Sequence, residues 1–163
     1  MAKEKAHIYI TDIHEPTLKR VAQENGAHIV GLDEIYDIDM DIYAPCALGA
    51  TVNDNALSRL KCSIIAGAAN NQLQQEDIHG KIVMEKGIIY APDFALNAGG
   101  VINCYSEVKS LSPDWAMQKA EEIYTTVGSI VKRSQAENIP TYQIANRMAE
   151  ERIASIGKVK LPM

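Results

Sequence analysis

The stretch AGAANNQL (residues 66–73), followed by YAPDFALNAGGVIN (residues 90–103), places small residues and amide side chains directly after two apolar runs that predict β-strands. A doubly wound α/β sheet binds its ligands at the carboxyl ends of its strands. The small residues let a bound molecule approach the backbone, and Asn70 and Asn97 offer hydrogen-bond donors and acceptors without net charge. Such a surface suits a nucleotide or a nicotinamide amide.

Outward from this stretch, short β-rich runs alternate with helical patterns, which is typical of a parallel sheet covered by helices. Strands are predicted at residues 7–11, 27–30, 42–44, 62–66 and 88–90. A helix is predicted from Pro16 to just before Gly26, and a short one around residues 52–60; Gly80 and Gly87 bracket a further helical turn. The predicted fold class is α/β, a Rossmann-type doubly wound parallel sheet.

The last third of the chain is predicted to be helical. A helix opens at Ser112 and carries apolar residues at helical spacing, and another runs from Thr141 to Gly157. Their apolar stripes are interpreted as surfaces that pack on the sheet or on a partner domain. The 163 residues are expected to form one partial domain, with the sheet and its helices over about residues 1–110 and C-terminal helices over about 111–163.

Composition limits the functions open to the chain. A chain of 163 residues with 47% hydrophobic content can build one ordinary core. The formal charge of −5 argues against a nucleic-acid binder or an anionic-membrane binder, because phosphate neutralisation needs a concentrated basic surface. The sequence shows no membrane-spanning apolar run and no signal peptide, so we expect a cytoplasmic protein.

No metal site is expected from the cysteines and histidines. The four histidines show no ligand spacing, and His14 and His79 lie on predicted loops. No grouping typical of a nucleophilic catalyst stands out either. The three widely spaced cysteines are interpreted as buried free thiols: Cys46, Cys62 and Cys104.

Five segments follow one another along the chain: YITDI (9–13), YAPCALGA (43–50), IAGAANNQL (65–73), IIYAPDFALNAGGVIN (88–103) and IPTYQIANRMAEERI (139–153). Together they resemble the C-terminal half of the family of leucine, phenylalanine, valine and glutamate dehydrogenases. The conjunction in this order is far more specific than any one segment. The resemblance implies the NAD-binding domain of an enzyme that oxidatively deaminates amino acids.

Asp12 lies where the first predicted strand finishes. A carboxylate there can accept hydrogen bonds from both ribose hydroxyls of an adenosine, and it would repel a 2′-phosphate, which favours NAD over NADP. The structural alternative is that Asp12 caps the following helix, because Asp is strongly favoured at helix N-termini. The resemblance favours the ribose contact, since YITDI matches the family's ribose-binding segment.

The other cofactor contacts are expected from loops after the later strands. The resemblance puts Cys46 and Ala47 along the nicotinamide side of the cofactor, although tight turns use the same residue types. Ala69 and Asn70 match the segment that contacts the nicotinamide ribose. Asn97 matches a residue that holds the nicotinamide and the substrate in register; its structural alternative is a helix cap.

Val127 and Ile130 match positions where the family lines its aliphatic substrate pocket. They lie one turn apart on one face of the predicted helix, which is consistent with such a role. Plain core packing explains them at least as well. The resemblance therefore implies oxidation of leucine, valine or isoleucine to a 2-oxo acid with NAD, and it favours these small amino-acid substrates only weakly.

Two parts of such an enzyme are not recognisable in the sequence. None of the ten glycines makes the GxGxxG spacing that holds the pyrophosphate, and the first predicted strand already carries the acidic residue expected about 20 residues beyond that motif. The sheet is therefore expected to lack its first βα unit. The family's GGxK-type lysine motif has no match, because Gly99 and Gly100 are followed by Val101 and Ile102. We expect no catalytic residue in this chain and no activity from it alone.

The missing unit has a structural consequence. In a sheet ordered 3-2-1-4-5-6, strand 1 is central, and its removal leaves a gap of about 9.6 Å, two strand spacings. Such a gap is not expected to persist. Either strand 2 shifts to pair with strand 4, or two chains exchange elements in a homo-oligomer and cover each other's edges. Part of a larger subunit would give the same sequence pattern.

Two other functions stay open at this point. The chain could be a non-catalytic nucleotide-binding or regulatory module that docks NAD weakly. It could also be an oligomerisation module without a ligand, in which case its melting temperature would depend on protein concentration.

Overall fold

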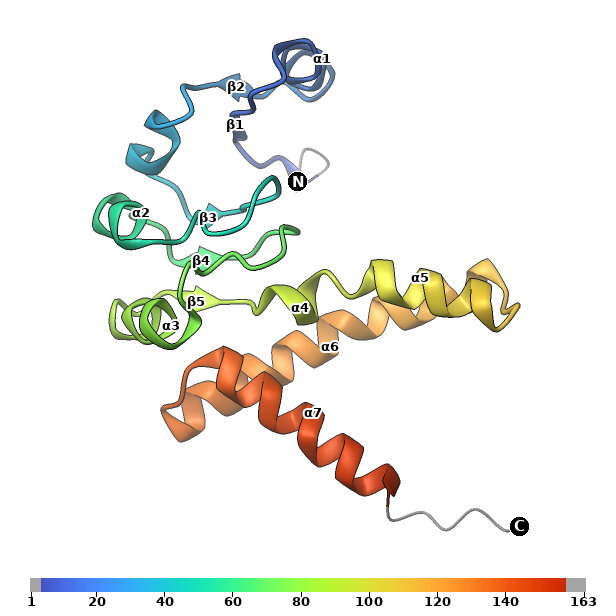
Figure 1. Cartoon of the computed structure of the whole chain (residues 1–163). Helices are drawn as coiled ribbons and strands as arrows, with labels where there is room; N and C mark the ends of the chain where they lie inside the picture. The colour runs from blue at the N-terminus through green and yellow to red at the C-terminus, as the bar shows by residue number, and fades with distance from the viewer. Residues whose placement is uncertain (1–3, 158–163) are drawn as a thin grey trace.

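Five short strands, all paired in parallel, form two separate sheets in the computed structural model, which describes residues 4–157 (Figure 1). The parallel strands and their connecting helices confirm the predicted α/β class. The strands are shorter than predicted. One sheet pairs β1 (Tyr9–Ile10) with β2 (His28–Ile29), and the other has the order β3 (Ile42–Tyr43), β4 (Ile64–Ile65), β5 (Ile89–Tyr90).

Helices connect successive strands, as the alternating pattern predicts. The first of them, α1, carries a proline in its first turn and ends at Gly26, whose φ of 64° closes the helix in the left-handed region. The connecting elements are α1 (Glu15–Asn25), the 3-10 helix η2 (Glu34–Asp37), α2 (Asp54–Arg59) and α3 (Glu76–Glu85), and the short helix α4 (Asp93–Leu96) follows the last strand.

The sequence predicts a helical turn that begins after Gly80 and ends before Gly87, and the predicted beginning is wrong. Helix α3 begins at Glu76, so Gly80 lies inside it and only Gly87, with a φ of 72°, follows its end. Gly80 is needed for packing: a Cβ there would lie 2.6 Å from the Tyr142 ring. The same helix buries His79, which was predicted to lie on a loop.

The main core surrounds the three-stranded sheet. Val52, Ala56 and Ile65 are fully buried in it, and α2 and α3 pack over the strands. The two-stranded sheet has far less cover, because Leu18 is the only buried residue between positions 4 and 30. A two-stranded unit of this kind is marginally stable without further packing.

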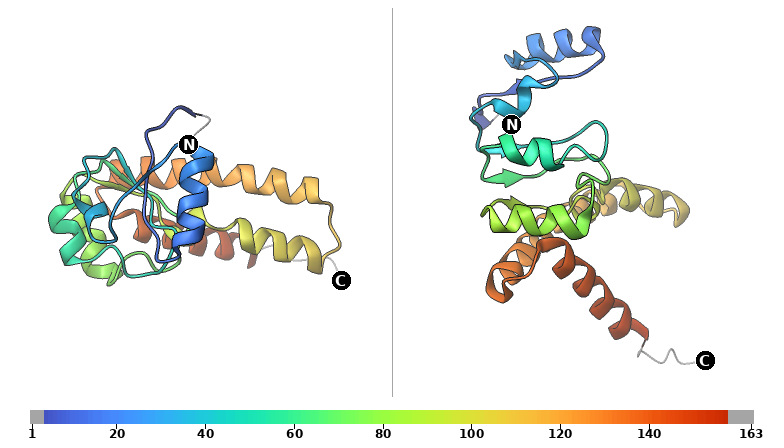
Figure 2. Two further views of the ribbon diagram at one scale, coloured as in Figure 1. Left: turned by 90° about the horizontal axis from the view of Figure 1, so that it is seen from above. Right: turned by 60° about the vertical axis from the view of Figure 1, so that its left-hand side comes forward.

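The C-terminal third consists of α5 (Gly99–Val108), α6 (Pro113–Glu137) and α7 (Thr141–Gly157). Figure 2 shows α5 and α6 running side by side away from the sheets. Helix α7 packs back on α6 through Ile144 and Ala145, and the Arg133 guanidinium binds Glu151 at 2.7 Å across the two helices. Within the described part of the chain, no helix is both long enough and apolar enough to cross a bilayer.

The gap that the sequence predicts in the sheet is not closed by a shift of strands. In the described residues β1 pairs only with β2, and β3 pairs only with β4, so the predicted shift of strand 2 onto strand 4 is wrong. Figure 1 shows β1 lying between β2 and β3.

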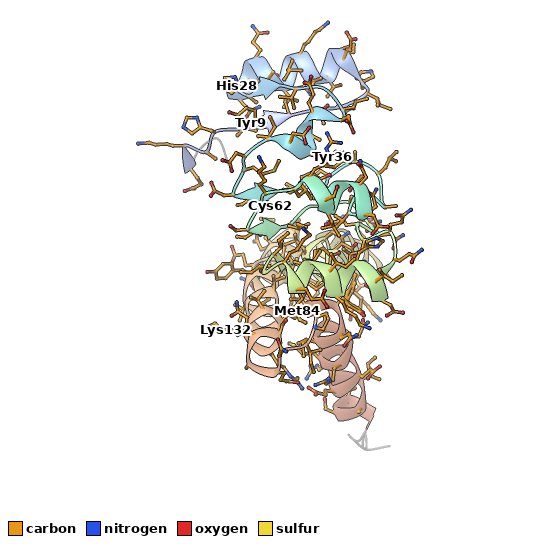
Figure 3. The ribbon with its side chains drawn as sticks, turned by 90° about the vertical axis from the view of Figure 1, so that its left-hand side faces the viewer. Tyr9, His28, Tyr36, Cys62, Met84 and Lys132 are labelled. Carbon is orange, nitrogen blue, oxygen red and sulfur yellow. The ribbon has the colours of Figure 1, made fainter. Side chains whose placement is uncertain are left out.

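The segment between β2 and β3 explains why the two sheets stay apart. The Arg59 guanidinium on α2 donates to Asp33 Oδ1 at 2.8 Å and to Asp37 Oδ2 at 2.7 Å, and it lies 5.5 Å from the Tyr36 ring centroid. Ile35 and Tyr36 also pack against the main core. Figure 3 shows Tyr36 between the two-stranded sheet and the region of Cys62. These contacts, which we call the Arg59 clamp, hold the segment in place.

We expect Arg59→Ala to loosen the N-terminal unit. The variant removes the contacts that anchor residues 31–41, so amides in β1 and β2 should exchange with solvent faster and the melting temperature should fall. Hydrogen exchange followed by mass spectrometry measures the first effect. Arg20→Ala is the matched control, because it removes only an exposed pair with Glu24 on α1. Equal exchange in the two variants would contradict this role of the clamp.

Candidate functional site

The loops that follow β3, β4 and β5 gather at the carboxyl edge of the three-stranded sheet. Because the three strands are parallel, their carboxyl ends lie at one edge. The loops cover residues 44–51, 66–72 and 91–97, and they contain the segments that the sequence singles out.

The first two loops are in close contact. The Ala69 amide donates to the Pro45 carbonyl at 3.0 Å, and a Cβ added to Gly67 would lie 2.0 Å from the same oxygen. Further along, the Ala50 amide donates to the Asn71 carbonyl at 2.7 Å. Only glycine allows the approach at position 67, so this residue sets the spacing between the two loops.

The side chain of Gln72 holds the conformation of the loop after β4. This side chain is fully buried, and its Nε2 donates to the Gly67 carbonyl at 2.6 Å and to the Ala69 carbonyl at 2.9 Å. A buried amide that satisfies two backbone carbonyls fixes the loop in one conformation.

Asp93 joins the loop after β4 to the loop after β5. Its buried carboxylate accepts from the Gln72 backbone amide at 2.8 Å and from the Tyr90 hydroxyl at 3.3 Å. Burial, with a further contribution from the Asp93 charge, raises the pKa of Tyr90, so the phenol stays protonated and keeps donating. The Asp93 backbone carbonyl also accepts from the Asn97 amide at 2.8 Å. Gln72 and Asp93 were not singled out from the sequence; a carboxylate directly after a buried strand is the signal that points to Asp93.

The structure brings Asn70 and Asn97 together. Asn97 Nδ2 donates to Asn70 Oδ1 at 2.5 Å and lies 3.4 Å from the Ala68 carbonyl oxygen. Asn97 ends α4, and its side chain does not cap α5, where the helix has no side-chain cap. The contact uses one hydrogen-bonding group of each amide and leaves Asn97 Oδ1 and Asn70 Nδ2 for other partners.

The remaining sequence-predicted residues on this edge differ in exposure. Cys46 and Ala47 are exposed, and Cys46 Sγ lies 3.5 Å from the Ala68 amide nitrogen. Ala69 is buried, so its contribution to this edge is through the backbone. The prediction of three buried thiols is wrong for Cys46 and Cys104, which are exposed because they lie on a loop and on the outer face of α5.

Asp12 follows β1 and is exposed. Its Oδ1 accepts from the His14 amide at 2.7 Å, while the side chain that caps α1 is His14, through Nδ1 and the Thr17 amide. The Asp12 carboxylate therefore holds the turn before α1 through Oδ1. Its other oxygen takes no part in this hydrogen bond.

Val127 and Ile130 are not equivalent in the structure. Ile130 is buried against Ile144 and Ala145, whereas Val127 is half-buried. A cavity of about 410 Å³ lies between α5 and α6, and neither residue lines it. Its lining residues are Ala95, Ala98, Val101, Ile102, Tyr105, Trp115, Lys119, Glu122, Ile123 and Thr126.

Metal ligands do not come together in the described part of the chain. Among residues 4–157 no group of three or more His, Cys, Asp or Glu side chains is placed so that it could hold a metal ion.

Comparisons with known proteins match almost the whole chain. The profile of the glutamate/leucine/phenylalanine/valine dehydrogenase family matches residues 2–160. Leucine dehydrogenase from Thermoactinomyces intermedius is 48% identical over 157 residues, which are 96% of this chain and 43% of that protein. Leucine dehydrogenase from Bacillus cereus is 49% identical over 94% of this chain and 42% of its own length.

A solved structure agrees with these matches. The crystal structure of L-tryptophan dehydrogenase from Nostoc punctiforme superposes with a TM-score of 0.93 at 37% identity, over 97% of this chain and 47% of that one. The chain thus spans less than half the length of these relatives.

We expect Gly67→Ala to destabilise the protein by about 3 kcal/mol, because the new methyl group would meet the Pro45 backbone. Gly99→Ala is the matched control, since a Cβ there meets nothing within 4 Å and alanine favours the helix. Thermal and urea unfolding of the two variants measure the difference. A loss in the control equal to that in Gly67→Ala would contradict the close approach of the loops.

Proposed function

The chain belongs to the glutamate/leucine/phenylalanine/valine dehydrogenase family, and we propose that it is part of the NAD-binding half of a leucine dehydrogenase-like enzyme. The observation that carries the proposal is the contact between Asn70 and Asn97 at the carboxyl edge of β4 and β5. This is the edge at which doubly wound sheets bind nucleotides.

The chemistry of this edge fits the nicotinamide end of NAD. Asn97 Oδ1 is an acceptor and Asn70 Nδ2 is a donor, which together complement the two hydrogen-bonding groups of a carboxamide. Ala47 and Ala68 are small and exposed, so a flat ring can approach the backbone beside them. The Gln72 and Asp93 contacts hold both asparagines in place before the ligand binds, which lowers the ordering cost of binding.

The carboxylate of Asp12 fits the adenosine end. One oxygen holds the turn before α1, and the other is available to accept from a ribose hydroxyl. Its negative charge disfavours a 2′-phosphate, so we propose NAD as the cofactor rather than NADP.

The reaction of the whole enzyme would be reversible oxidative deamination of leucine, valine or isoleucine. Bound NAD supplies the hydride acceptor, and hydrolysis of the resulting imine gives the 2-oxo acid and ammonia. Of the two proposed pocket residues, Val127 retains the exposure that a substrate wall needs, while Ile130 supports it from the core. We propose no catalytic residue in this chain, which on its own would bind NAD without turning over leucine.

An oligomerisation role is the second candidate. Large apolar side chains are exposed on the outer helices, and Tyr124 is 88% exposed, Val108 80% and Val101 74%. We propose that these exposed side chains contact other protein, as contiguous apolar surface does. A homo-oligomer built through it would show a melting temperature that rises with protein concentration.

We expect calorimetry to detect NAD binding to the chain and Asp12→Ala to weaken it about tenfold, because a charge-assisted hydrogen bond is lost. The variant should also lose preference for NAD over NADP. Asp39→Ala, which removes another exposed carboxylate, should leave both affinities unchanged.

A leucine-dependent assay of NADH absorbance completes the test. No turnover is expected from the chain alone. Turnover, or NAD binding that Asp12→Ala leaves untouched, would contradict the proposed roles, and absence of NAD binding would favour the oligomerisation role.

A further inference from the structure

The Ala68 carbonyl decides which way round the Asn70–Asn97 pair is hydrogen-bonded. Asn97 Nδ2 donates to Asn70 Oδ1 at 2.5 Å and lies 3.4 Å from the Ala68 carbonyl oxygen. A carbonyl oxygen can only accept, so the nitrogen of the Asn97 amide must face Ala68. The reversed pair would place Asn97 Oδ1 against that oxygen, with two acceptors in contact. The direction of the Ala68 carbonyl therefore sets which donor and which acceptor the pair presents to a ligand.

The peptide group between Ala68 and Ala69 links the loop after β3 to Asn97. The described residues contain no cis peptide bond, and in a trans peptide the N–H and the C=O point in opposite directions. The Ala69 amide donates to the Pro45 carbonyl at 3.0 Å, so the Ala68 carbonyl points away from Pro45 and toward Asn97 at the end of α4. Figure 1 shows the loops after β3 and β4 on the same side of the three-stranded sheet as α4.

Gln72 holds the carbonyls on either side of Ala68. Its Nε2 donates to the Gly67 carbonyl at 2.6 Å and to the Ala69 carbonyl at 2.9 Å. Three successive carbonyls thus alternate in direction: those of Gly67 and Ala69 turn inward to the buried Gln72 amide, and that of Ala68 turns outward to Asn97. Gly67, Ala69 and Gln72 are all buried, so solvent cannot replace this donor.

We propose that Gln72 is a positioning residue that fixes the polarity of the Asn70–Asn97 pair and thereby makes the site select a carboxamide over a carboxylate. The inference rests on the proposed function, because the ligand group concerned is the carboxamide of NAD. With the Ala68 carbonyl turned outward, the pair offers Asn70 Nδ2 as a donor and Asn97 Oδ1 as an acceptor. A carboxamide complements both groups. Gln72 is fully buried and acts on the pair through the loop backbone.

A carboxylate cannot complement the same pair. Both of its oxygens accept, so one can bind Asn70 Nδ2 while the other faces Asn97 Oδ1. The pair cannot reverse to offer two donors, because the Ala68 carbonyl holds Asn97 Nδ2. A site built to hydrogen-bond an N–H group rejects an analogue that lacks it, since the polar group of the site is then left unpaired. The site should therefore discriminate between two dinucleotides that differ only in this group.

The test compares NAD with nicotinic acid adenine dinucleotide, in which a carboxylate replaces the carboxamide. Calorimetry measures both affinities for the 163-residue chain. We expect the acid to bind at least about tenfold more weakly, the factor for one unsatisfied hydrogen bond. The difference should persist at about 0.5 M salt, where repulsion between the extra ligand charge and distant charges of the protein is screened.

Gln72→Met tests the positioning role. Methionine has a similar length but no donor, so the Gly67 and Ala69 carbonyls lose their partner and the Ala68 carbonyl is no longer held outward. NAD should bind more weakly, and the ratio of the two dissociation constants should fall to within about threefold of one. Val83→Ala is the matched control, because it removes buried atoms of α3 and lowers stability without touching these carbonyls. It should leave the ratio unchanged, as Gln72→Met would if Gln72 only stabilised the fold.

Side-chain exchange in the unmodified chain covers the case in which Gln72→Met does not fold. Both Nε2 protons of Gln72 donate to carbonyls, whereas Gln74 is exposed. By NMR, the Gln72 side-chain protons should exchange with solvent at least about tenfold more slowly than those of Gln74. Equal exchange at the two side chains would overturn the positioning role.

Failure of this inference can be told from failure of the proposed function. Stronger binding of NAD than of the acid, with a ratio that collapses in Gln72→Met and not in Val83→Ala, supports the positioning role. Equal binding of both dinucleotides to the unmodified chain overturns it and leaves NAD binding intact. A ratio that survives in folded Gln72→Met also overturns it. Absence of binding by either dinucleotide overturns the proposed function together with the inference.

Discussion

The buried Asp93 carboxylate is the contact on which the candidate site depends. It accepts from the Gln72 backbone amide and the Tyr90 hydroxyl, and the Asp93 backbone carbonyl holds the Asn97 amide. Through Gln72 it also fixes the carbonyls of the loop that carries Asn70. A buried charge needs several donors to offset its desolvation, and here the donors come from the loop after β4 and from β5. The same requirement therefore brings the two asparagines together.

The rest of the molecule is uneven in how well it is packed. The three-stranded sheet forms the main core with α2 and α3, and α6 and α7 add a second cluster around Ile130 and Ile144. The β1–α1–β2 unit buries only Leu18 and is tied to the main core through the segment that Arg59 binds. Local stability should follow this division, because regions with few buried apolar contacts open first. The nicotinamide side of the proposed site thus rests on the firm part of the fold and Asp12 on the weaker part.

Local patterns in the sequence were enough to predict the alternating elements and the α/β class. A cap such as Gly26, or an apolar run, determines the structure of only the few residues around it. The placement of Asn70 and Asn97 at one edge also followed, because parallel strands end together. Contacts between distant segments did not follow. Gly80 looks like a boundary but serves the Tyr142 contact 62 positions later (142 − 80), and Arg59 carries no sign that it binds Asp33 and Asp37. The predicted shift of strand 2 onto strand 4 failed for the same reason, because the Arg59 contacts that anchor the segment between β2 and β3 are tertiary contacts.

The two sheet edges that face each other, those of β1 and β3, have a consequence for how further strands can add to the sheets. An ordinary open sheet edge can template the addition of strand after strand, because every strand that joins presents a new edge to the next. Here the backbone groups of Tyr9 point away from β2 and those of Ile42 point away from β4, so two open edges border one gap. A strand placed in that gap would bond to both edges and would leave no open edge there for another strand. Addition at this place therefore ends after one strand and does not lead to polymerisation.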